Sequence, residues 1–427
     1  MDAHGSRPIR LVVGDASLRR RRLTVFLRLL LALPHLVWLG LWGLAASVAA
    51  VVLWLGVLIE GRAPSSVHDF VAGYLRYATH VAAYLFLAAD PYPGFRGAPG
   101  YPLDVAVDPP ARQSRWSALV RLVLALPAAL LAAALGGGLA WTALIGPYAL
   151  AATLVSGGGA AGTAALLVWF AALATGRAPR DLRDLIAYAL GYSAQSAGYA
   201  LLLTGRYPTA DPTVAEPFAE LSEHPIHLAV GGDLMRPRLL VLFRWLLALP
   251  HLVWLVLWGL GVLLVVIAAW LAALATGRVP QPLHRFLAAY VRYATHVSGF
   301  LSLVGRTFPG FTGRASSYEV DVDLPGPVRQ RRLSVLARLL LVVPALLLAN
   351  ALGTVLWVVA ALSWWYALVC GRVPEGLRNL GAICVRYGAQ TYAYLLLVTG
   401  RYPSASPTLH ARARAEPQPL LLPGDAF

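Results

Sequence analysis

The stretch Leu-Ala-Leu-Pro-His-Leu-Val-Trp-Leu decides the fold, because it occurs at residues 31–39 and again, unchanged, at residues 247–255. The two copies lie 216 residues apart, and the same shift maps Trp54 onto Trp270 and His80 onto His296. Self-similarity at a fixed offset is the sequence signature of an internal repeat. The chain is therefore predicted to contain copies of one structural unit.

Two weaker copies fill the gaps between these segments. The segment 121–127 resembles 338–344, and Thr-Gly-Arg-Tyr-Pro occurs at both 204–208 and 399–403. We therefore predict four tandem units, at residues 8–96, 101–209, 225–312 and 318–404. The second unit has about 22 extra residues near 136–160, and a flexible tail follows at 405–427.

The composition favours a membrane protein, since 58% of the residues are hydrophobic and only 13% are charged. Soluble domains have roughly half apolar and a quarter charged residues. Between Leu23 and Ile59 the only strongly polar side chains are Arg28 and His35, and a run of that length is more than enough to cross a bilayer. We predict a mainly α, polytopic transmembrane helical protein of the plasma membrane, without a signal peptide.

Each unit is predicted to have the same layout. It opens with a short alternating stretch that is typical of a β-strand, followed by an arginine-rich lead, a Pro, a long apolar run, a Gly-Arg turn and a final helix. The four strands would all lie on one side of the membrane, where they would form a small cytoplasmic sheet. The alternating apolar residues are Ile9, Leu11 and Val13; Leu103, Val105 and Val107; Ile226, Leu228 and Val230; and Val320, Val322 and Leu324.

Two arrangements in the membrane stay open. In one, an interfacial piece up to the Pro is followed by one crossing, and the run 116–175 of the second unit divides at its two Gly-Gly-Gly stretches into three crossings. In the other, the run 23–59 is a tight hairpin and the final helix lies on the surface. Most arginines fall in the strand-bearing segments, so the positive-inside rule places the strands in the cytoplasm.

These motifs resemble those of the bacterial domain-of-unknown-function family 4389, whose units combine a strand, an arginine-rich lead, Leu-x-x-Pro-His, a tryptophan-bearing span and Gly-Arg-x-Pro. The resemblance covers nearly the whole chain. The even units depart from it, with Ala128 and Ala345 where the His belongs and Gly191 where Arg76 stands in the first unit. The resemblance implies residence in a membrane and no particular activity.

All 35 basic residues are arginines, and the formal net charge is +15. The absence of lysine excludes Schiff-base chemistry and P-loop phosphate binding. Guanidinium groups bind phosphate oxygens well, so we predict that Arg19, Arg20, Arg21 and Arg22 hold anionic lipid headgroups rather than nucleic acid.

Four histidines recur as two pairs, His35 with His80 and His251 with His296. One hypothesis is a shared site between the odd units that binds a metal or haem or relays protons. The favoured interpretation puts His35 and His251 at the lipid–water interface and His80 and His296 in hydrogen bonds between helices. No carboxylate or cysteine stands at ligand spacing, so no metal or cofactor is predicted.

Arginine recurs in the middle of the final helices, four residues before His80, His296 and Gln390, which places each pair on one helix face. One hypothesis is that Arg76, Arg292 and Arg386 line an anion path. The favoured one is that they reach headgroups or pair with Asp69 and its equivalents. Gln195 and Gln390 are interpreted as contacts between helices.

No catalytic motif is present, so enzymatic activity has no support. The favoured function is a non-enzymatic membrane scaffold or accessory protein, whose strands, linkers and tail bind partner proteins. A transporter or channel that uses intramembrane Arg and His is the first alternative, because the two halves are related. A haem- or metal-binding redox protein is the second.

Overall fold

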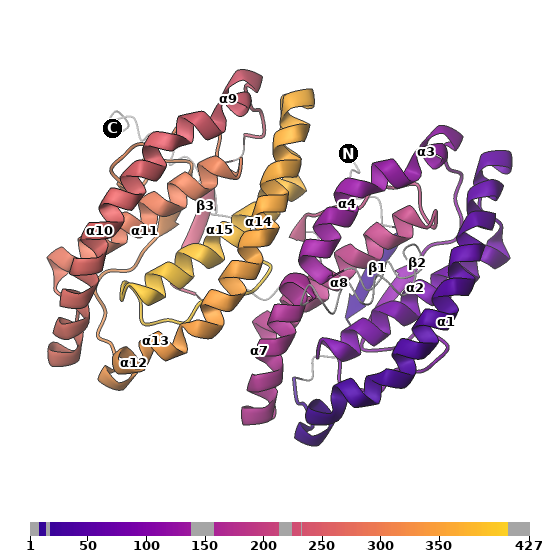
Figure 1. Ribbon diagram of the computed structural model, residues 1–427, viewed down its shortest axis with the longest axis horizontal. Coiled ribbons are helices and arrows are strands. Elements are labelled where there is room, and N and C mark those ends of the chain that lie inside the picture. The colour runs from indigo at the N-terminus through magenta and orange to yellow at the C-terminus, as the bar shows by residue number, and fades with distance from the viewer. Residues whose placement is uncertain (1–7, 14–17, 138–157, 213–223, 232, 409–427) are drawn as a thin grey trace, which may run out of the picture.

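The computed structural model of the chain describes residues 8–13, 18–137, 158–212, 224–231 and 233–408 (Figure 1). Long apolar helices alternate with shorter helices that return along them. The long helices are α1 (Arg22–Glu60), α4 (Arg121–Gly136) with α7 (Gly159–Thr175), α10 (Arg244–Thr276) and α14 (Val343–Cys370). The return helices are α2 (Ser65–Leu85), α8 (Arg180–Ala200), α11 (Gln281–Leu301) and α15 (Glu375–Leu395). Short helices precede three of the long ones: α3 (Arg115–Leu119), α9 (Arg238–Leu242), and α12 (Arg332–Leu336) with α13 (Arg338–Leu341).

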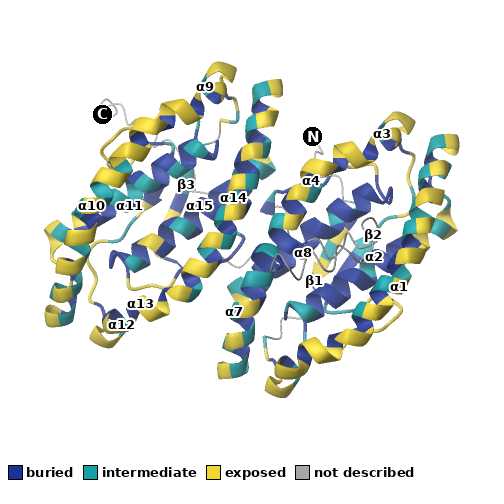
Figure 2. Ribbon diagram, viewed as in Figure 1, coloured by how far each residue is buried: buried dark blue, intermediate teal, exposed yellow. Residues whose placement is uncertain are grey.

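Three helical stretches, 22–60, 244–276 and 338–370, are long and apolar enough to cross a membrane. Figure 2 shows that the long helices carry most of the exposed surface, whereas α2, α8 and α15 are mostly buried. Exposed side chains of the long helices are largely Leu, Val, Phe and Trp. A surface of this kind is compatible with a membrane protein.

Helix α1 continues through Pro34 without a break. Because proline removes one backbone hydrogen bond, the sequence suggested a separate interfacial piece before it. Buried contacts on both sides of Pro34, at Arg28 and His35, hold the two parts against α2 and keep the helix continuous. The run 23–59 is therefore one helix and not a tight hairpin. Each long helix ends at a glycine with positive φ, such as Gly61, which the Gly-Arg turn supplies.

All four predicted strands are present, but they form two separate sheets rather than one. Strand β1 (Ile9–Val13) pairs antiparallel with β2 (Leu103–Val107), and β3 (His227–Val230) pairs antiparallel with β4 (Val320–Asp323). The first sheet packs on α2 and α8, whereas β3 packs on α15 and β4 on α11. Each sheet is thus fixed by its own two return helices, which keeps the pairs apart.

Neighbouring segments contact one another reciprocally. The carbonyl of Gly61 accepts from the N–H of Gln113, and the carbonyl of Gly176 accepts from the N–H of Arg20. The indole of Trp54 donates to Ala118 in the same way as Trp169 donates to Val25. The second half repeats the pattern with Gly277 and Gln330, Gly371 and Arg236, Trp270 and Val335, and Trp364 and Val241. This reciprocity is that of an approximate two-fold axis.

The two-fold pairing places arginines of neighbouring segments side by side. Arg19 forms a β-bridge with Arg177, and Arg62 forms one with Arg112. The arginine-rich lead of one segment therefore lies beside the Gly-Arg turn of its neighbour. Counting the two groups as opposite sides of a membrane, as the sequence suggested, does not match this arrangement.

Glycine lets the first sheet lie close to the middle of α8. A Cβ at Gly191 would lie 3.3 Å from Cβ of Leu11, a tight contact. Gly191 occupies the position of Arg76 in the first unit, and the close passage of β1 explains the exchange. Helix α14 contacts both α4 and α7, and this contact joins the two halves.

Two predictions fall partly outside the described residues. The extra segment near 136–160 lies mostly within 138–157, so the predicted division into three crossings is not described beyond α4 and α7. Most of the predicted tail also lies outside, from residue 409 onward. Its first residues, including Ser406, are buried.

Candidate functional site

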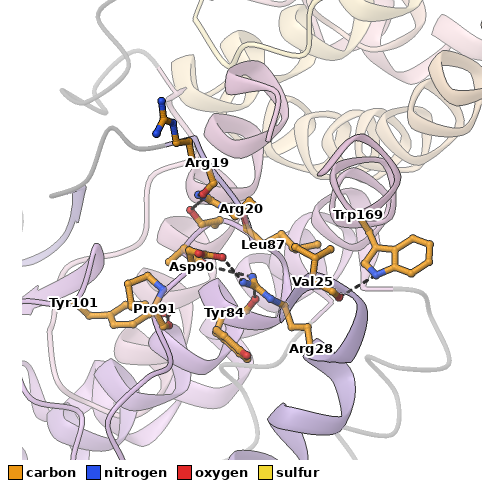
Figure 3. Close-up of polar contacts among 12 residues, drawn as sticks. Arg19, Arg20, Val25, Arg28, Tyr84, Leu87, Asp90, Pro91, Tyr101 and Trp169 are labelled. Carbon is orange, nitrogen blue, oxygen red and sulfur yellow. Dashed lines mark hydrogen bonds and ion pairs between the residues drawn. The ribbon is translucent and has the colours of Figure 1, made fainter. Parts of the chain in front are cut away.

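Arg28, in the second turn of α1, is buried and reaches the end of α2. It donates to the carbonyls of Tyr84 at 2.7 Å and Ala89 at 3.0 Å, and to the carboxylate of Asp90 at 2.8 Å (Figure 3). Its guanidinium lies 4.4 Å from the centre of the Tyr84 ring. The last carbonyls of a helix lack partners within the helix, and a cation there is favoured. Arg28 therefore caps α2 from a neighbouring helix.

The same cap is built in all four helix pairs. Each arginine lies over an aromatic ring at 4.2 to 4.4 Å and donates to two carbonyls at the end of the return helix. The other three are Arg121 on Tyr199 and Thr204, Arg244 on Phe300 and Gly305, and Arg338 on Tyr394 and Thr399. Sequence reasoning missed this set, although each of these arginines stands six residues before the Pro of its unit.

A second side chain holds the same helix ends. In the odd units Arg20 and Arg236 donate to carbonyls there, and in the even units Gln113 and Gln330 do so. Each end contains a leucine with positive φ, a conformation that costs non-glycine residues about 1–2 kcal/mol. These are Leu87, Leu202, Leu303 and Leu397, with φ of 61°, 62°, 59° and 62°.

The arginines predicted to bind lipid headgroups are placed in two environments. Arg20 is only 5% exposed and donates to the carbonyls of Leu87 and Ala88. Its guanidinium is therefore hydrogen-bonded inside the protein and does not face lipid headgroups. Arg19, Arg21 and Arg22 are exposed, and Arg19 points away from the Arg28 cap in Figure 3. Headgroup binding therefore stays a prediction for these three residues.

Arg76 and His80 share one face of α2, and both meet strand β2 at Asp104. Nε2 of His80 lies 2.8 Å from the Asp104 carboxylate, and Nε of Arg76 lies 3.5 Å from the same oxygen. Arg76 also donates to the carbonyl of Val105. Asp69, the partner suggested from the sequence, instead lies beside His68. The cluster ties the return helix to the strand.

The second half repeats this cluster with Arg292, His296 and Asp321. The carboxylate of Asp321 lies 3.1 Å from Nε2 of His296 and 3.3 Å from Nε of Arg292. Sequence reasoning missed both aspartates, because it searched for carboxylates within the helices. The available signal was an Asp at the second position of both strands, in Leu-Asp-Val and Val-Asp-Val.

The even units replace the histidine with glutamine. Gln195 accepts from the N–H of Thr209, and Gln390 accepts from the N–H of Ser404. Gln390 also donates to the carbonyl of Ile226. Arg386 donates to carbonyls in the segment that follows the helix, at Ser406 and Thr408. These side chains contact extended chain rather than another helix.

His35 and His251 lie in aromatic surroundings. Nδ1 of His35 is 2.7 Å from the hydroxyl of Tyr77, and its ring stacks on Phe95 at 4.3 Å. His251 repeats this with Tyr293 and Phe311. Both imidazoles are fully buried. The ring nitrogens face the protein rather than an exposed interface.

The structure does not gather the predicted polar residues into one site. His35 and His80 have different partners in the first half, and His251 and His296 have different partners in the second. Among the described residues, no group of three or more His, Cys, Asp and Glu is placed to hold a metal ion. These contacts join helices to strands and loops.

We expect His80 to make the folded state less stable as the pH falls below about 6.5. Burial lowers the pKa of His80, an effect that Asp104 opposes and Arg76 adds to. The unfolded chain then binds more protons than the folded chain in this range, so the free energy of unfolding decreases as the pH falls. His80→Gln, the residue of the even units, removes this contribution. Unfolding midpoints of both proteins between about pH 7.5 and 5 test it, and equal pH slopes would contradict it.

Comparison with known proteins finds one family. The sequence model described as "Domain of unknown function (DUF4389)" matches residues 22–96, 238–312 and 332–406. Each match spans one long helix and its return helix. No curated protein and no solved structure matches the chain.

Proposed function

We propose that this chain, which belongs to the DUF4389 family, is a non-enzymatic membrane scaffold whose strand-bearing face binds partner proteins. One observation carries the proposal. The buried arginines, glutamines and histidines of the described residues are engaged in contacts that hold the fold, from the Arg28 cap to the Asp104 cluster. Side chains used in this way support a structural role for the repeat.

Several finer features belong to this proposal. We place the protein at the bacterial plasma membrane, with Arg19, Arg21 and Arg22 at anionic headgroups. We also propose that residues 101–209 are a diverged fourth copy of the unit. The reciprocal contacts of this segment with the first one support this, as does its Arg121 cap.

Partner binding is testable with photo-crosslinking residues placed on the outward face of the sheets. We expect substitutions at Val12 and His227, both exposed, to give the same protein adduct in cells. The matched control is Val48 on α1, which is 68% exposed and lies among apolar side chains. A different adduct at each position, or none at either, would contradict a scaffold that acts through this face.

Liposome flux tests the transporter alternative. Arg76, Arg292 and Arg386 contact backbone carbonyls, so we expect purified protein to carry no solute or ion. Flux by the wild type that the triple alanine variant loses would replace the scaffold proposal with a transporter. A Soret band or bound metal in the purified protein would instead favour the redox alternative.

A further inference from the structure

Helix α1 is longer than a bilayer crossing requires. Its 39 residues span about 58 Å, whereas the hydrocarbon core of a bilayer is about 30 Å thick. Exposed apolar side chains run along its whole length, from Leu23 (73% exposed) through Leu41 (57%) to Ile59 (70%). To keep all of them in hydrocarbon, a crossing helix would tilt by roughly 55–60°, beyond the usual 0–40°.

The strands lie alongside the helices and not beyond their ends. Helix α2 returns along α1, with Tyr77 against His35 and Tyr84 against Arg28. Strand β2 contacts the same part of α2, since Asp104 meets His80. If this part of α1 crossed the bilayer, the first sheet would therefore lie within the hydrocarbon.

The outward face of the first sheet carries an exposed ion pair beside Val12. Ile9 and Leu11 of β1 approach α8, at Gly198 and Gly191, so Arg10 faces the other way. Arg10 pairs with Asp108, and the two side chains are 50% and 37% exposed. Facing hydrocarbon, an exposed ion pair and the open edges of a two-stranded sheet are strongly disfavoured.

The long helices present a continuous uncharged surface on the other side. Arg28 is the only charged residue between Leu23 and Ile59, and it is buried. Helices α10 and α14 continue this surface, with Leu264 74% and Trp357 61% exposed. In Figure 1, which looks down the shortest axis, these helices all run within the plane of the picture. Such a layer matches a surface that lies along a membrane.

Charge at the helix ends fits the same orientation. Exposed arginines stand at both ends of the long-helix layer, with Arg19 beside Arg177 at one end and Arg62 beside Arg112 at the other. A crossing bundle normally concentrates positive charge on one side. Arginines at both ends suit helices whose two ends meet headgroups of the same leaflet.

We propose that the chain lies in one leaflet of the bilayer, with α1, α4, α7, α10 and α14 in the hydrocarbon and the two sheets in water. This arrangement rests on the membrane attachment of the proposed scaffold and says how the chain is attached. It replaces the multi-pass crossing predicted from the sequence. It presents the strand face to cytoplasmic proteins when the occupied leaflet is the inner one.

Spin-label depth measurements test the proposal. A background variant, Cys370→Ala with Cys384→Ala, receives one cysteine at Leu30, Leu41, Val52 or Val12 and is reconstituted in vesicles of phosphatidylcholine and phosphatidylglycerol at about 3:1. We expect the three α1 labels to have the same shallow depth and the Val12 label to be in water. Leu30, Leu41 and Val52 are well exposed, and Val12 is 49% exposed, so the labels leave the core intact.

A crossing helix gives a different result. The Leu41 label would then lie up to about 16 Å from the Leu30 label along the membrane normal, and the Val12 label would enter the hydrocarbon. That outcome overturns the one-leaflet arrangement and leaves membrane attachment intact. If no α1 label contacts lipid, membrane attachment itself fails, and the scaffold proposal fails with it.

Discussion

Replacing Arg244 with methionine is expected to lower the free energy of unfolding by about 3 kcal/mol. Arg244 is 1% exposed and donates to the carbonyls of Phe300 and Gly305 at the end of α11. Methionine fills much of the same volume but leaves both buried acceptors without these donors. It also removes the contact of the guanidinium with the Phe300 ring, 4.2 Å from its centre. The loss outweighs the relief of removing a buried charge, because the acceptors remain buried.

The matched control for this variant is Arg285→Met in the same half of the chain. Arg285 is exposed near the start of α11, and surface substitutions of this kind usually change stability by less than about 0.5 kcal/mol. Thermal unfolding in mild detergent, followed by tryptophan fluorescence, compares the two. An Arg244→Met midpoint equal to that of the control would refute the capping role.

Gly97→Ala is expected to destabilise the protein by about 3 kcal/mol as well. Gly97 has a φ of +60°, and a Cβ there would lie 2.7 Å from the carbonyl oxygen of Gly73 and 3.0 Å from Cβ of Tyr77. The first contact involves helix backbone, which cannot move without disturbing α2. The loop that contains Gly97 also brings Phe95 onto His35, so the substitution should loosen that packing.

Gly94→Ala provides the control, because the same loop has no atom within 4 Å of a Cβ at this position. We expect it to unfold at nearly the wild-type temperature. Gly313, which has the same positive φ and approaches the carbonyl of Ala289, should respond as Gly97 does. Equal midpoints for the Gly94 and Gly97 variants would show that the loop does not need this close approach.

The two predictions concern one construction principle. The arginine before each Pro caps a return helix, and the glycine after the return helix lets the chain lie close enough to reach the next strand. In the first half these steps lead from Arg28 through Gly97 to Asp104, and in the second from Arg244 through Gly313 to Asp321. A unit held together by these contacts suits a platform on a membrane, the role proposed above.

The sequence by itself determined the repeat, the extent of the apolar runs and the positions of the four strands in the described part of the chain. These features depend on local periodicity and hydropathy, which a repeat shows several times over. The alternation of Ile9, Leu11 and Val13 was enough to place β1, and Gly61 marked the end of α1. The spacing of Arg76 and His80 also placed them correctly on one helix face.

Only the tertiary structure decided which residues meet. Arg28 lies 56 residues from Tyr84, and Trp169 lies 144 residues from Val25, so neither contact follows from a local period. The reciprocal pairing of neighbouring segments brings arginine-rich leads next to Gly-Arg turns, which the sequence had assigned to opposite sides of the membrane. It also places Asp104 of one segment beside His80 of the other. Burial then makes these contacts structural, because a buried guanidinium or imidazole is stable only where acceptors surround it.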